Sequence, residues 1–150
     1  MTTSDQTFHV QPYLNFAGRC EEALEFYRRA LGARVQFLMR FKENPDPGCP
    51  PANAEKICHV SFQVGQTLLM ASDGRCEGAP SFKGFSLSLN VKSVAEAEKF
   101  FAALADGGEV QMPLAKTFFS PSFGMVADRF GLCWMIHTLP ATPAATSSSP

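Results

Sequence analysis

The sequence has no apolar segment long enough to cross a membrane and no basic stripe that would hold a phosphate backbone. Its 13 lysine and arginine residues are balanced by 14 aspartate and glutamate residues, so the formal net charge is −1 at pH 7. The N-terminal segment MTTSDQTFHV has neither the charged nor the apolar region of a signal peptide. We therefore expect a cytoplasmic protein that binds neither nucleic acid nor membrane.

Two kinds of short motif are also missing. The five cysteines are an odd number, and none of them stands in a C-x-x-C pair, which is typical of free thiols in the cytoplasm. A catalytic cysteine would need a lowered pKa, and nothing local in the sequence indicates one. No G-x-G sequence lies between a predicted strand and a predicted helix, so the sequence does not indicate a nucleotide-binding turn.

The most informative feature that is present is an internal duplication. LNFAGRCEEALEFYRRALGARVQ at Leu14–Gln36 is repeated as LNVKSVAEAEKFFAALADGGEVQ at Leu89–Gln111. The offset is 75 residues at both ends of this match and 74 in its middle, which is half of the 150-residue chain. Two copies of one module are therefore expected, and paired modules often enclose a cavity that binds a small molecule.

Hydrophobic periodicity predicts the same order of elements in both halves. The strands are expected at Phe8–Phe16, Arg34–Phe41, Lys56–Val64, Gln66–Ser72, Gly84–Val91, Glu109–Ala115, Gly124–Arg129 and Leu132–Thr138. The helices are expected at Arg19–Leu31 and, with Ser93 as N-cap, at Val94–Ala105. The proline-rich segment Lys42–Glu55 is expected to be a loop.

These elements predict an α+β fold of two tandem βαβββ modules, at about residues 8–72 and 84–138, with curved mixed sheets around a cavity. We expect residues 1–138 to form a single domain. The segment 139–150, which is rich in Pro, Ala, Ser and Thr, is expected to be a disordered tail.

Alternation separates the two faces of each strand. In the third strand Val60, Phe62 and Val64 alternate with polar residues, and the polar row faces either solvent or a ligand. The last strand favours a cavity because both of its faces are apolar or amphipathic. We expect Trp134 to fill the core on the helix side. The residues expected to converge on one pocket are Gln11, Tyr13, His59, Ser61, Ser86, Ser88 and Met135.

Three segments carry a resemblance to a known family: NFAGRCEEALEFYRRALGA, HVSFQVGQTLLMASD and FFSPSFGMVADRFGLCWMIH. They resemble the PhnB-like branch of the glyoxalase/bleomycin-resistance/dioxygenase superfamily, also called vicinal oxygen chelate proteins. The match runs from about Val10 to His137, and the F-G-x-V-x-D-x-F-G-x-x-W pattern within Phe118–His137 is specific for that branch. The resemblance implies paired βαβββ modules. Many relatives are labelled 3-demethylubiquinone-9 3-methyltransferase, but without a glycine-rich turn we expect no binding of S-adenosylmethionine.

The resemblance also implies where a divalent metal is usually held in the superfamily. Carried over by position, its ligand sites fall at Gln11, at or next to Met70, at Ser86 and at Met135. Only Gln11 suits a hard or borderline cation, because methionine sulfur is soft and a neutral serine is a poor ligand. We therefore expect no metal or other cofactor at the usual site. The alternative is a displaced divalent metal held by His9, Gln11 and His137.

His59 is the best candidate for a general acid or base, since its unperturbed pKa lies near neutrality. Asp128 is expected to cap a turn, and Phe118 and Phe119 to form a lid or a wall.

Two classes of function stay open. One is a metal-independent protein that binds a small molecule, for instance for sequestration or resistance. The other is a lyase or dioxygenase that uses a displaced metal or His59. A homodimer is expected in either case.

Overall fold

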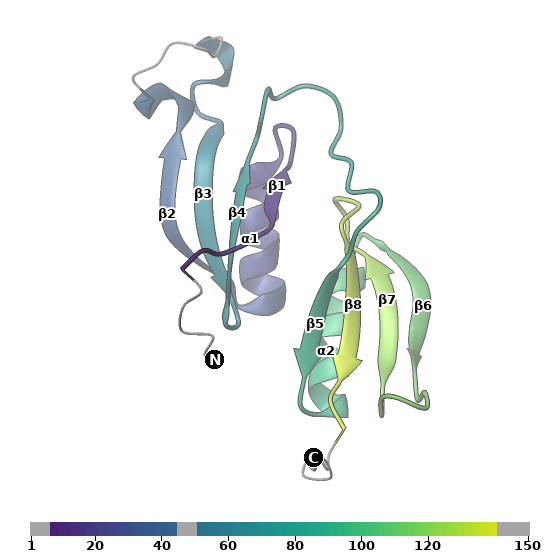
Figure 1. The fold of residues 1–150 in the computed structure, drawn as a ribbon. Coiled ribbons are helices and arrows are strands. Elements are labelled where there is room, and N and C mark those ends of the chain that lie inside the picture. The colour runs from purple at the N-terminus through teal and green to yellow at the C-terminus, as the bar shows by residue number, and fades with distance from the viewer. Residues whose placement is uncertain (1–6, 45–50, 141–150) are drawn as a thin grey trace. The chain divides into compact units, whose positions relative to one another are not determined.

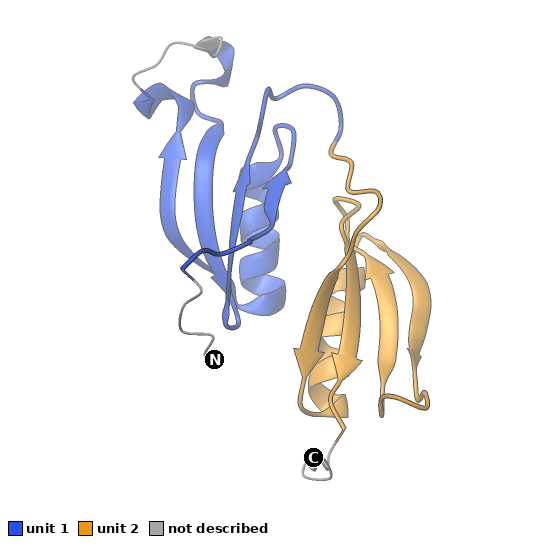
Figure 2. Cartoon of the chain, viewed as in Figure 1, with its two compact units in different colours: residues 1–79 blue, residues 80–150 orange. Residues whose placement is uncertain are grey.

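The computed structural model describes residues 7–44 and 51–140, with only the backbone of Pro51. The chain divides into two compact units, residues 1–79 and residues 80–150, shown in blue and orange in Figure 2. Each unit contains one of the two repeated modules. Among the described residues, no helix is long and apolar enough to cross a membrane.

The first unit is a four-stranded sheet with one helix on one face (Figure 1). Its elements are β1 (Tyr13–Asn15), α1 (Cys20–Leu31), β2 (Arg34–Arg40), β3 (Ile57–Val64) and β4 (Thr67–Ser72). The strand order is β1-β4-β3-β2, in which β1 is parallel to β4 and the other pairs are antiparallel.

The second unit repeats this topology. Its elements are β5 (Leu87–Val91), α2 (Val94–Ala105), β6 (Glu109–Ala115), β7 (Phe123–Ala127) and β8 (Cys133–Thr138), and the strand order is β5-β8-β7-β6. Phe26 and Phe100 are each the seventh residue of their helix. The predicted α+β fold of two βαβββ modules is therefore confirmed.

Most predicted elements agree with the structure to within a few residues, and the first strand differs most. The strand expected over Phe8–Phe16 is only Tyr13–Asn15. Pro12 has no N–H to donate, and its carbonyl accepts from Met70 N at 3.2 Å just before β1 begins. The expected loop at Lys42–Glu55 contains two short 3-10 helices, Phe41–Glu43 and Pro51–Asn53, while residues 45–50 lie outside the described part. The expected tail at 139–150 lies almost wholly outside it as well.

The core of the first unit lies between α1 and its sheet. Ala23, Phe26 and Tyr27 are buried on the inner side of the helix. The ring of Tyr27 stacks on Phe62 of β3, with centroids 6.4 Å apart and an interplanar angle of 4°. Gly32 ends α1 in the left-handed conformation (φ 74°), which suits glycine because other residues are strained there.

The start of α1 is capped by a side chain from β4 and not by its own N-cap residue. Arg19 makes no side-chain capping hydrogen bond. Asp73, which directly follows β4 and is 1% exposed, accepts hydrogen bonds through Oδ1 from Gly18 N and Cys20 N, both at 2.8 Å. Its Oδ2 accepts from Ile57 N, also at 2.8 Å, at the start of β3. One carboxylate thus joins α1, β3 and β4.

In the second unit one residue caps the helix and another joins neighbouring segments. Ser93 caps α2 as predicted, because its Oγ accepts from Glu96 N at 3.1 Å. Asp128, buried between β7 and β8, accepts from Phe130 N at 2.9 Å, from Leu132 N at 3.1 Å and from Trp134 Nε1 at 2.9 Å. The expected role of Asp128 in the turn is confirmed. Trp134 is 3% exposed and lies in the core as expected.

We predict that Asp73→Asn lowers the free energy of unfolding by about 2–4 kcal/mol, because an amide nitrogen would face a backbone N–H donor and leave it unsatisfied in the interior. Chemical denaturation followed by circular dichroism measures this change. The matched control is Asp106→Asn, whose carboxylate pairs with Arg129 at the surface and is 73% exposed. The control should change stability by less than about 1 kcal/mol. Equal effects of the two variants would contradict the role assigned to Asp73.

Candidate functional site

The face of the first sheet opposite α1 carries a continuous row of side chains across all four strands. Tyr13 pairs with Met70, Met70 with Ser61, and Ser61 with Phe37. We call Tyr13, Met70, Ser61 and Phe37 the first row. Side chains alternate along a strand, and the neighbours Leu14, Ala71 and Phe62 are buried under the helix, so the first row lies on the helix-free face.

His59 lies beside this row and is hydrogen-bonded across the sheet. The Tyr13 hydroxyl is 2.8 Å from His59 Nδ1, although β4 lies between β1 and β3. The imidazole ring has its centroid 5.5 Å from that of Tyr13 and 6.0 Å from that of Phe37. His59 is thus flanked by two aromatic rings, and the hydroxyl fixes the orientation of its ring. An oriented imidazole of this kind can bind a polar group or transfer a proton.

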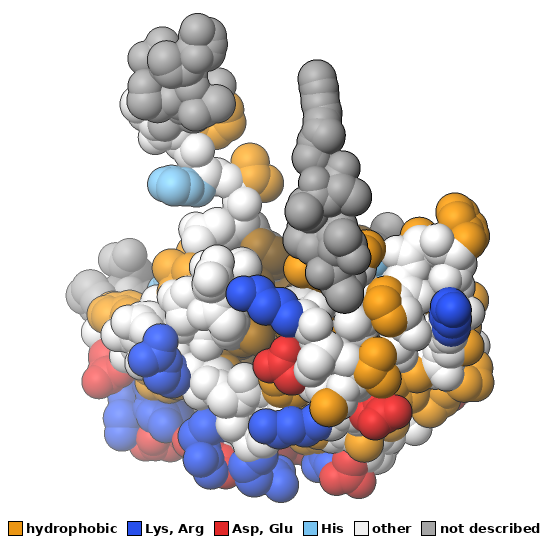
Figure 3. Space-filling model, turned by 90° about the horizontal axis from the view of Figure 1, so that it is seen from below, with side chains coloured by type: hydrophobic (Ala, Val, Ile, Leu, Met, Phe, Trp, Pro, Cys, Tyr) orange, Lys and Arg blue, Asp and Glu red, His pale blue; other side chains and the backbone are white. Residues whose placement is uncertain are grey.

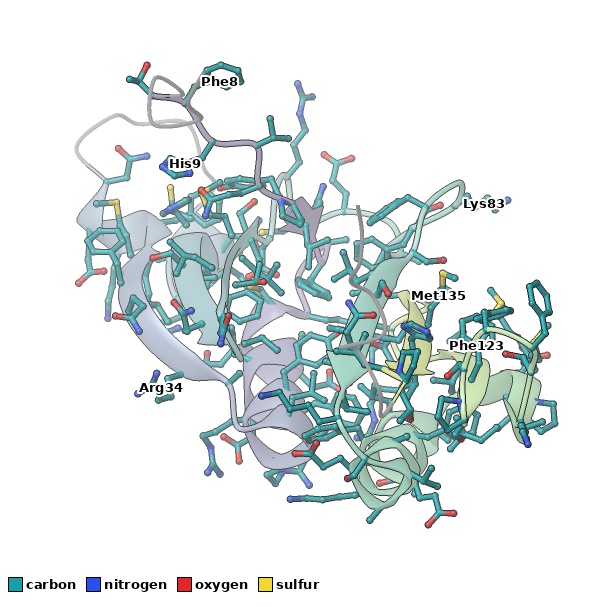
Figure 4. All side chains as sticks on the ribbon, turned by 60° about the horizontal axis from the view of Figure 1, so that its bottom comes forward. Phe8, His9, Arg34, Lys83, Phe123 and Met135 are labelled. Atoms are coloured by element: carbon teal, nitrogen blue, oxygen red, sulfur yellow. The ribbon has the colours of Figure 1, made fainter. Side chains whose placement is uncertain are left out.

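The two residues predicted before β1 behave differently from Tyr13. Gln11 donates from Nε2 to the carbonyl of Leu68 at 3.1 Å, which holds it against the start of β4. His9 is exposed on the segment that precedes β1 (Figure 4). Within the first unit the structure therefore brings together Tyr13, His59 and Ser61, and it places Gln11 at the edge of the same sheet.

The helix-free face of the second sheet carries an equivalent row of different chemistry. Ser88 pairs with Met135, Met135 with Met125, and Met125 with Met112. We call Ser88, Met135, Met125 and Met112 the second row. Tyr13 and Ser88 occupy equivalent positions in the duplicated modules, as do Met70 and Met135. The duplication has therefore kept the geometry of the row and changed its side chains.

Next to the second row lies an aromatic cluster around His137. The ring of His137 is 5.9 Å from Phe119 and 6.3 Å from Phe123, and its Nδ1 donates to Asn90 Oδ1 at 3.1 Å. Figure 4 shows Phe123 and Met135 on neighbouring strands of this unit. Phe119 forms a wall of the cluster, whereas Phe118 is 99% exposed. The alternation of apolar residues along the strands did not predict that Phe119, in the loop between β6 and β7, would pack against His137.

One end of the second helix-free face forms a pocket of about 620 Å³. Residues 80–86 line one side of it, and Gln111, Gly131 and Cys133 complete it. Ser86, a predicted site residue, belongs to this pocket. The Cys133 thiol donates to Gln111 Oε1 at 3.0 Å. The expected convergence of Ser86, Ser88 and Met135 with the residues of the first unit stays a prediction.

The structure shows free cysteines and makes Cys20 unsuited to act as a catalytic thiol. Cys20, Cys58, Cys76 and Cys133 form no disulfide in the described part of the chain, and Cys49 lies outside it. Burial raises the pKa of the Cys20 thiol, and the negative charges of Asp73 and Glu21 raise it further. Cys20 therefore stays protonated at neutral pH and is a poor nucleophile.

The positions that hold a metal in the superfamily are occupied here by soft or weak ligands. Met70 and Met135 stand in the two rows, and Ser86 lines the pocket of the second unit. In residues 7–44 and 51–140, no three His, Cys, Asp or Glu side chains gather where they would hold a metal ion. The donor set at the usual positions does not fit a hard divalent cation. The displaced set of His9, Gln11 and His137 stays untested.

Comparison with known proteins decides the family. The family model described as 3-demethylubiquinone-9 3-methyltransferase matches residues 9–137. The chain belongs to this PhnB-like family. Protein YjdN of Escherichia coli (strain K12) is 34% identical over 145 residues, which cover 89% of this chain and 97% of YjdN. The resemblance to the PhnB-like branch is thereby confirmed.

Two solved structures share the fold over nearly their whole length. Protein PA1353 from Pseudomonas aeruginosa is 44% identical, with a TM-score of 0.79 over 89% of this chain and 98% of that one. A putative 3-demethylubiquinone-9 3-methyltransferase, PhnB protein, from Bacillus cereus is 26% identical, with a TM-score of 0.74 over 87% of this chain and 99% of that one.

More distant structures share the fold alone. The fosfomycin resistance protein FosX from Listeria monocytogenes is 8% identical with a TM-score of 0.62, covering 95% of this chain and 99% of that one. A glyoxylase/bleomycin resistance protein/dioxygenase domain from Frankia sp. EAN1pec is 15% identical with a TM-score of 0.60, covering 91% and 98% of the two chains. These similarities agree with the glyoxalase-like fold of the two modules.

The family's name does not match the nucleotide-binding features of this chain, because the sequence has no G-x-G turn. We predict that calorimetric titration with S-adenosylmethionine gives no binding in the micromolar range. Micromolar binding in this titration would contradict the prediction.

We also predict that the protein purified without a metal-chelating resin carries far less than one equivalent of Zn, Ni, Fe or Mn per chain, because methionine and serine side chains are poor ligands for these ions. Elemental analysis by mass spectrometry measures the content. One equivalent of metal that is lost in Gln11→Ala, and also in His9→Gln or His137→Gln, would instead support the displaced site. The control is Gln66→Ala, which changes an exposed glutamine in the turn between β3 and β4.

Proposed function

We propose that this PhnB-like protein binds an uncharged, planar small molecule on the helix-free face of its first sheet, without the metal usual in the superfamily. The observation that carries the proposal is the Tyr13–His59 hydrogen bond within an aromatic and thioether surface. Such surfaces gain binding energy from flat apolar ligands, while a few placed polar groups orient them.

The chemistry of the first row supports an uncharged ligand. A phenol, a thioether, a hydroxyl and a phenyl ring stand across the sheet from Tyr13 to Phe37, and the imidazole of His59 lies beside them. These groups offer π faces, a soft sulfur atom and neutral hydrogen-bonding atoms. A compact anion would need cationic or N–H donors at the same place to replace its hydration.

The hydrogen-bonded pair of Tyr13 and His59 also determines which hydrogen-bonding group the ligand needs. The Tyr13 hydroxyl and His59 Nδ1 are hydrogen-bonded to each other at 2.8 Å, so the second nitrogen of the imidazole, Nε2, is left to hydrogen-bond a ligand. A ligand with one hydroxyl or carbonyl at the rim of a flat ring system would stack on Phe37 and reach Nε2 at the same time. We therefore expect a hydroxylated or carbonyl-bearing aromatic compound.

The test uses 2-naphthol, which is neutral, planar and fluorescent, and naphthalene-2-sulfonate, which has the same rings with a negative charge. We predict that 2-naphthol binds more tightly than the sulfonate and that His59→Gln raises its Kd about tenfold, equivalent to one lost hydrogen bond of about 1.4 kcal/mol. Tyr13→Phe should weaken binding less, because the imidazole remains.

The matched control is His9→Gln, which removes an exposed histidine from the segment before β1 and should leave the Kd unchanged. Fluorescence titration measures all four proteins. The proposal is wrong if the sulfonate binds more tightly than 2-naphthol, or if the His59 and His9 variants have the same affinity for 2-naphthol.

The oriented imidazole also supports a second candidate function, a lyase-type reaction in which His59 moves a proton. The Tyr13–His59 hydrogen bond favours it because a fixed ring is what general acid–base catalysis requires. Loss of turnover in His59→Gln with unchanged binding of the substrate would distinguish this function from binding alone.

The homodimer expected from the sequence stays a prediction, which light scattering would test.

A further inference from the structure

The three methionines of the second unit all stand in the second row, on the helix-free face. Met112, Met125 and Met135 lie directly opposite one another on the adjacent strands β6, β7 and β8. The side of the sheet that α2 covers is filled instead by residues such as Val126 and Trp134, which are buried. Methionine in this unit is therefore used on the open face and not in the core.

The thioethers of the row are accessible. Met112 is 46% exposed, and Met125 and Met135 are half-buried. Hydrophobic side chains, the class that includes methionine, form part of the exposed surface in the space-filling view (Figure 3). The sulfur atoms of such a face can be approached by a ligand, and their lone pairs are weak hydrogen-bond acceptors that leave them available to one.

The spacing of the row lets the three sulfur atoms converge. Neighbouring strands lie about 5 Å apart, so Met112 and Met135 each start about 5 Å from Met125, one on either side. The methionine side chain is unbranched and turns about three bonds, which makes it adaptable. The two outer side chains can therefore lean toward the central one, so that three sulfur atoms surround one point above β7.

Aromatic rings shield one side of this point. Phe123 precedes Met125 by two residues on β7 and so lies on the same face of the sheet. Its ring centroid is 5.1 Å from that of Phe119, and Figure 4 shows it close to the strand that carries Met135. An apolar wall of this kind disfavours a strongly hydrated ion, because the ion would lose water without gaining polar partners.

The chemistry of the donors selects a soft cation. Thioether sulfur is neutral and polarisable and suits Cu(I), whereas magnesium and calcium need oxygen ligands, and zinc needs imidazole, thiolate or carboxylate. Ag(I) resembles Cu(I) in charge and softness, and both ions accept as few as two or three ligands. The first row offers no such set, because Met70, the equivalent of Met135, has Tyr13 and Ser61 as its neighbours.

We propose that Met112, Met125 and Met135 form a binding site for one soft monovalent cation of the Cu(I) type. The three sulfur atoms supply the ligands, and the rings of Phe119 and Phe123 keep water from one side of the ion. Only Met135 belongs to the positions that hold a divalent metal in the superfamily. The site is separate from the surface around His59, which lies in the other unit and offers different chemistry.

The test uses Ag(I), which has the ligand preference of Cu(I) and is stable in air. Free thiols also bind this ion, and Cys133 lies two residues before Met135 on the same face of β8. The titrations therefore use full-length protein in which every cysteine except the buried Cys20 is replaced by serine. Protein whose accessible thiols are alkylated with iodoacetamide is the second preparation.

NMR of isotope-labelled methionine methyl groups follows the titration. One equivalent of Ag(I) should shift the signals of Met112, Met125 and Met135 together and leave those of Met39 and Met70 in the first unit unchanged. Zn(II) at the same concentration should shift none of them. The proposal is overturned if Ag(I) shifts none of the three signals, if it shifts those of Met39 and Met70 equally, or if Zn(II) acts as Ag(I) does.

Two leucine variants test the central ligand. Met125→Leu removes one sulfur atom at nearly constant side-chain volume, and it should weaken the binding of Ag(I) by about tenfold or more. The control Met39→Leu removes a half-buried methionine from β2 and should leave the affinity unchanged. The same affinity in both variants would contradict a site built on the second row. The result does not depend on 2-naphthol, which is tested on the first unit.

Discussion

Asp73 accepts three backbone N–H groups in a place that excludes water, and the first unit is organised around it. The groups belong to the residues where α1 and β3 begin, and Asp73 itself stands where β4 ends. A buried carboxylate is costly unless it is fully hydrogen-bonded, so the arrangement ties three segments far apart in the chain to a single geometry. The second unit uses Asp128 in a comparable way, with two backbone groups and the indole of Trp134 as donors. The two aspartates are not equivalent in the duplication, and each module has thus acquired its own anchor.

These anchors matter for function because they act on the helix side and at the strand ends. The side chains on the helix-free faces then contribute little to the stability of each unit. This explains how two modules with the same topology present rows as different as phenol–thioether–hydroxyl–phenyl and hydroxyl–thioether–thioether–thioether. The first row with His59 offers hydrogen bonds and π faces, whereas the second offers mainly sulfur. Any ligand preference of the chain is therefore more easily changed by substitution than its fold.

The periodicity of the sequence predicted the helices, the order of elements along each module and the buried faces of β3 and β8, because local spacing determines which side chains share a face. The core position of Trp134 and the cap at Ser93 followed from the same local rules. The partnership of Tyr13 and His59 did not, since the two residues are 46 positions apart and a third strand lies between them. Simple alternation would put Val35 and Phe37 on one face of β2, but the bulge between them places Phe37 on the helix-free face. The structural role of Asp73 was missed because its donors are backbone groups, which no side-chain pattern reveals.

The second row places three thioether side chains side by side on adjacent strands, with Met112 46% exposed at the sheet edge. Oxidants convert thioethers to sulfoxides, which are polar, chiral and reducible by dedicated reductases. Oxidation at the edge would turn a soft apolar strip into one that accepts hydrogen bonds, without disturbing the helix side that holds the module together. The helix-free face of the second unit is thus a surface whose polarity depends on the oxidation state of its sulfur atoms.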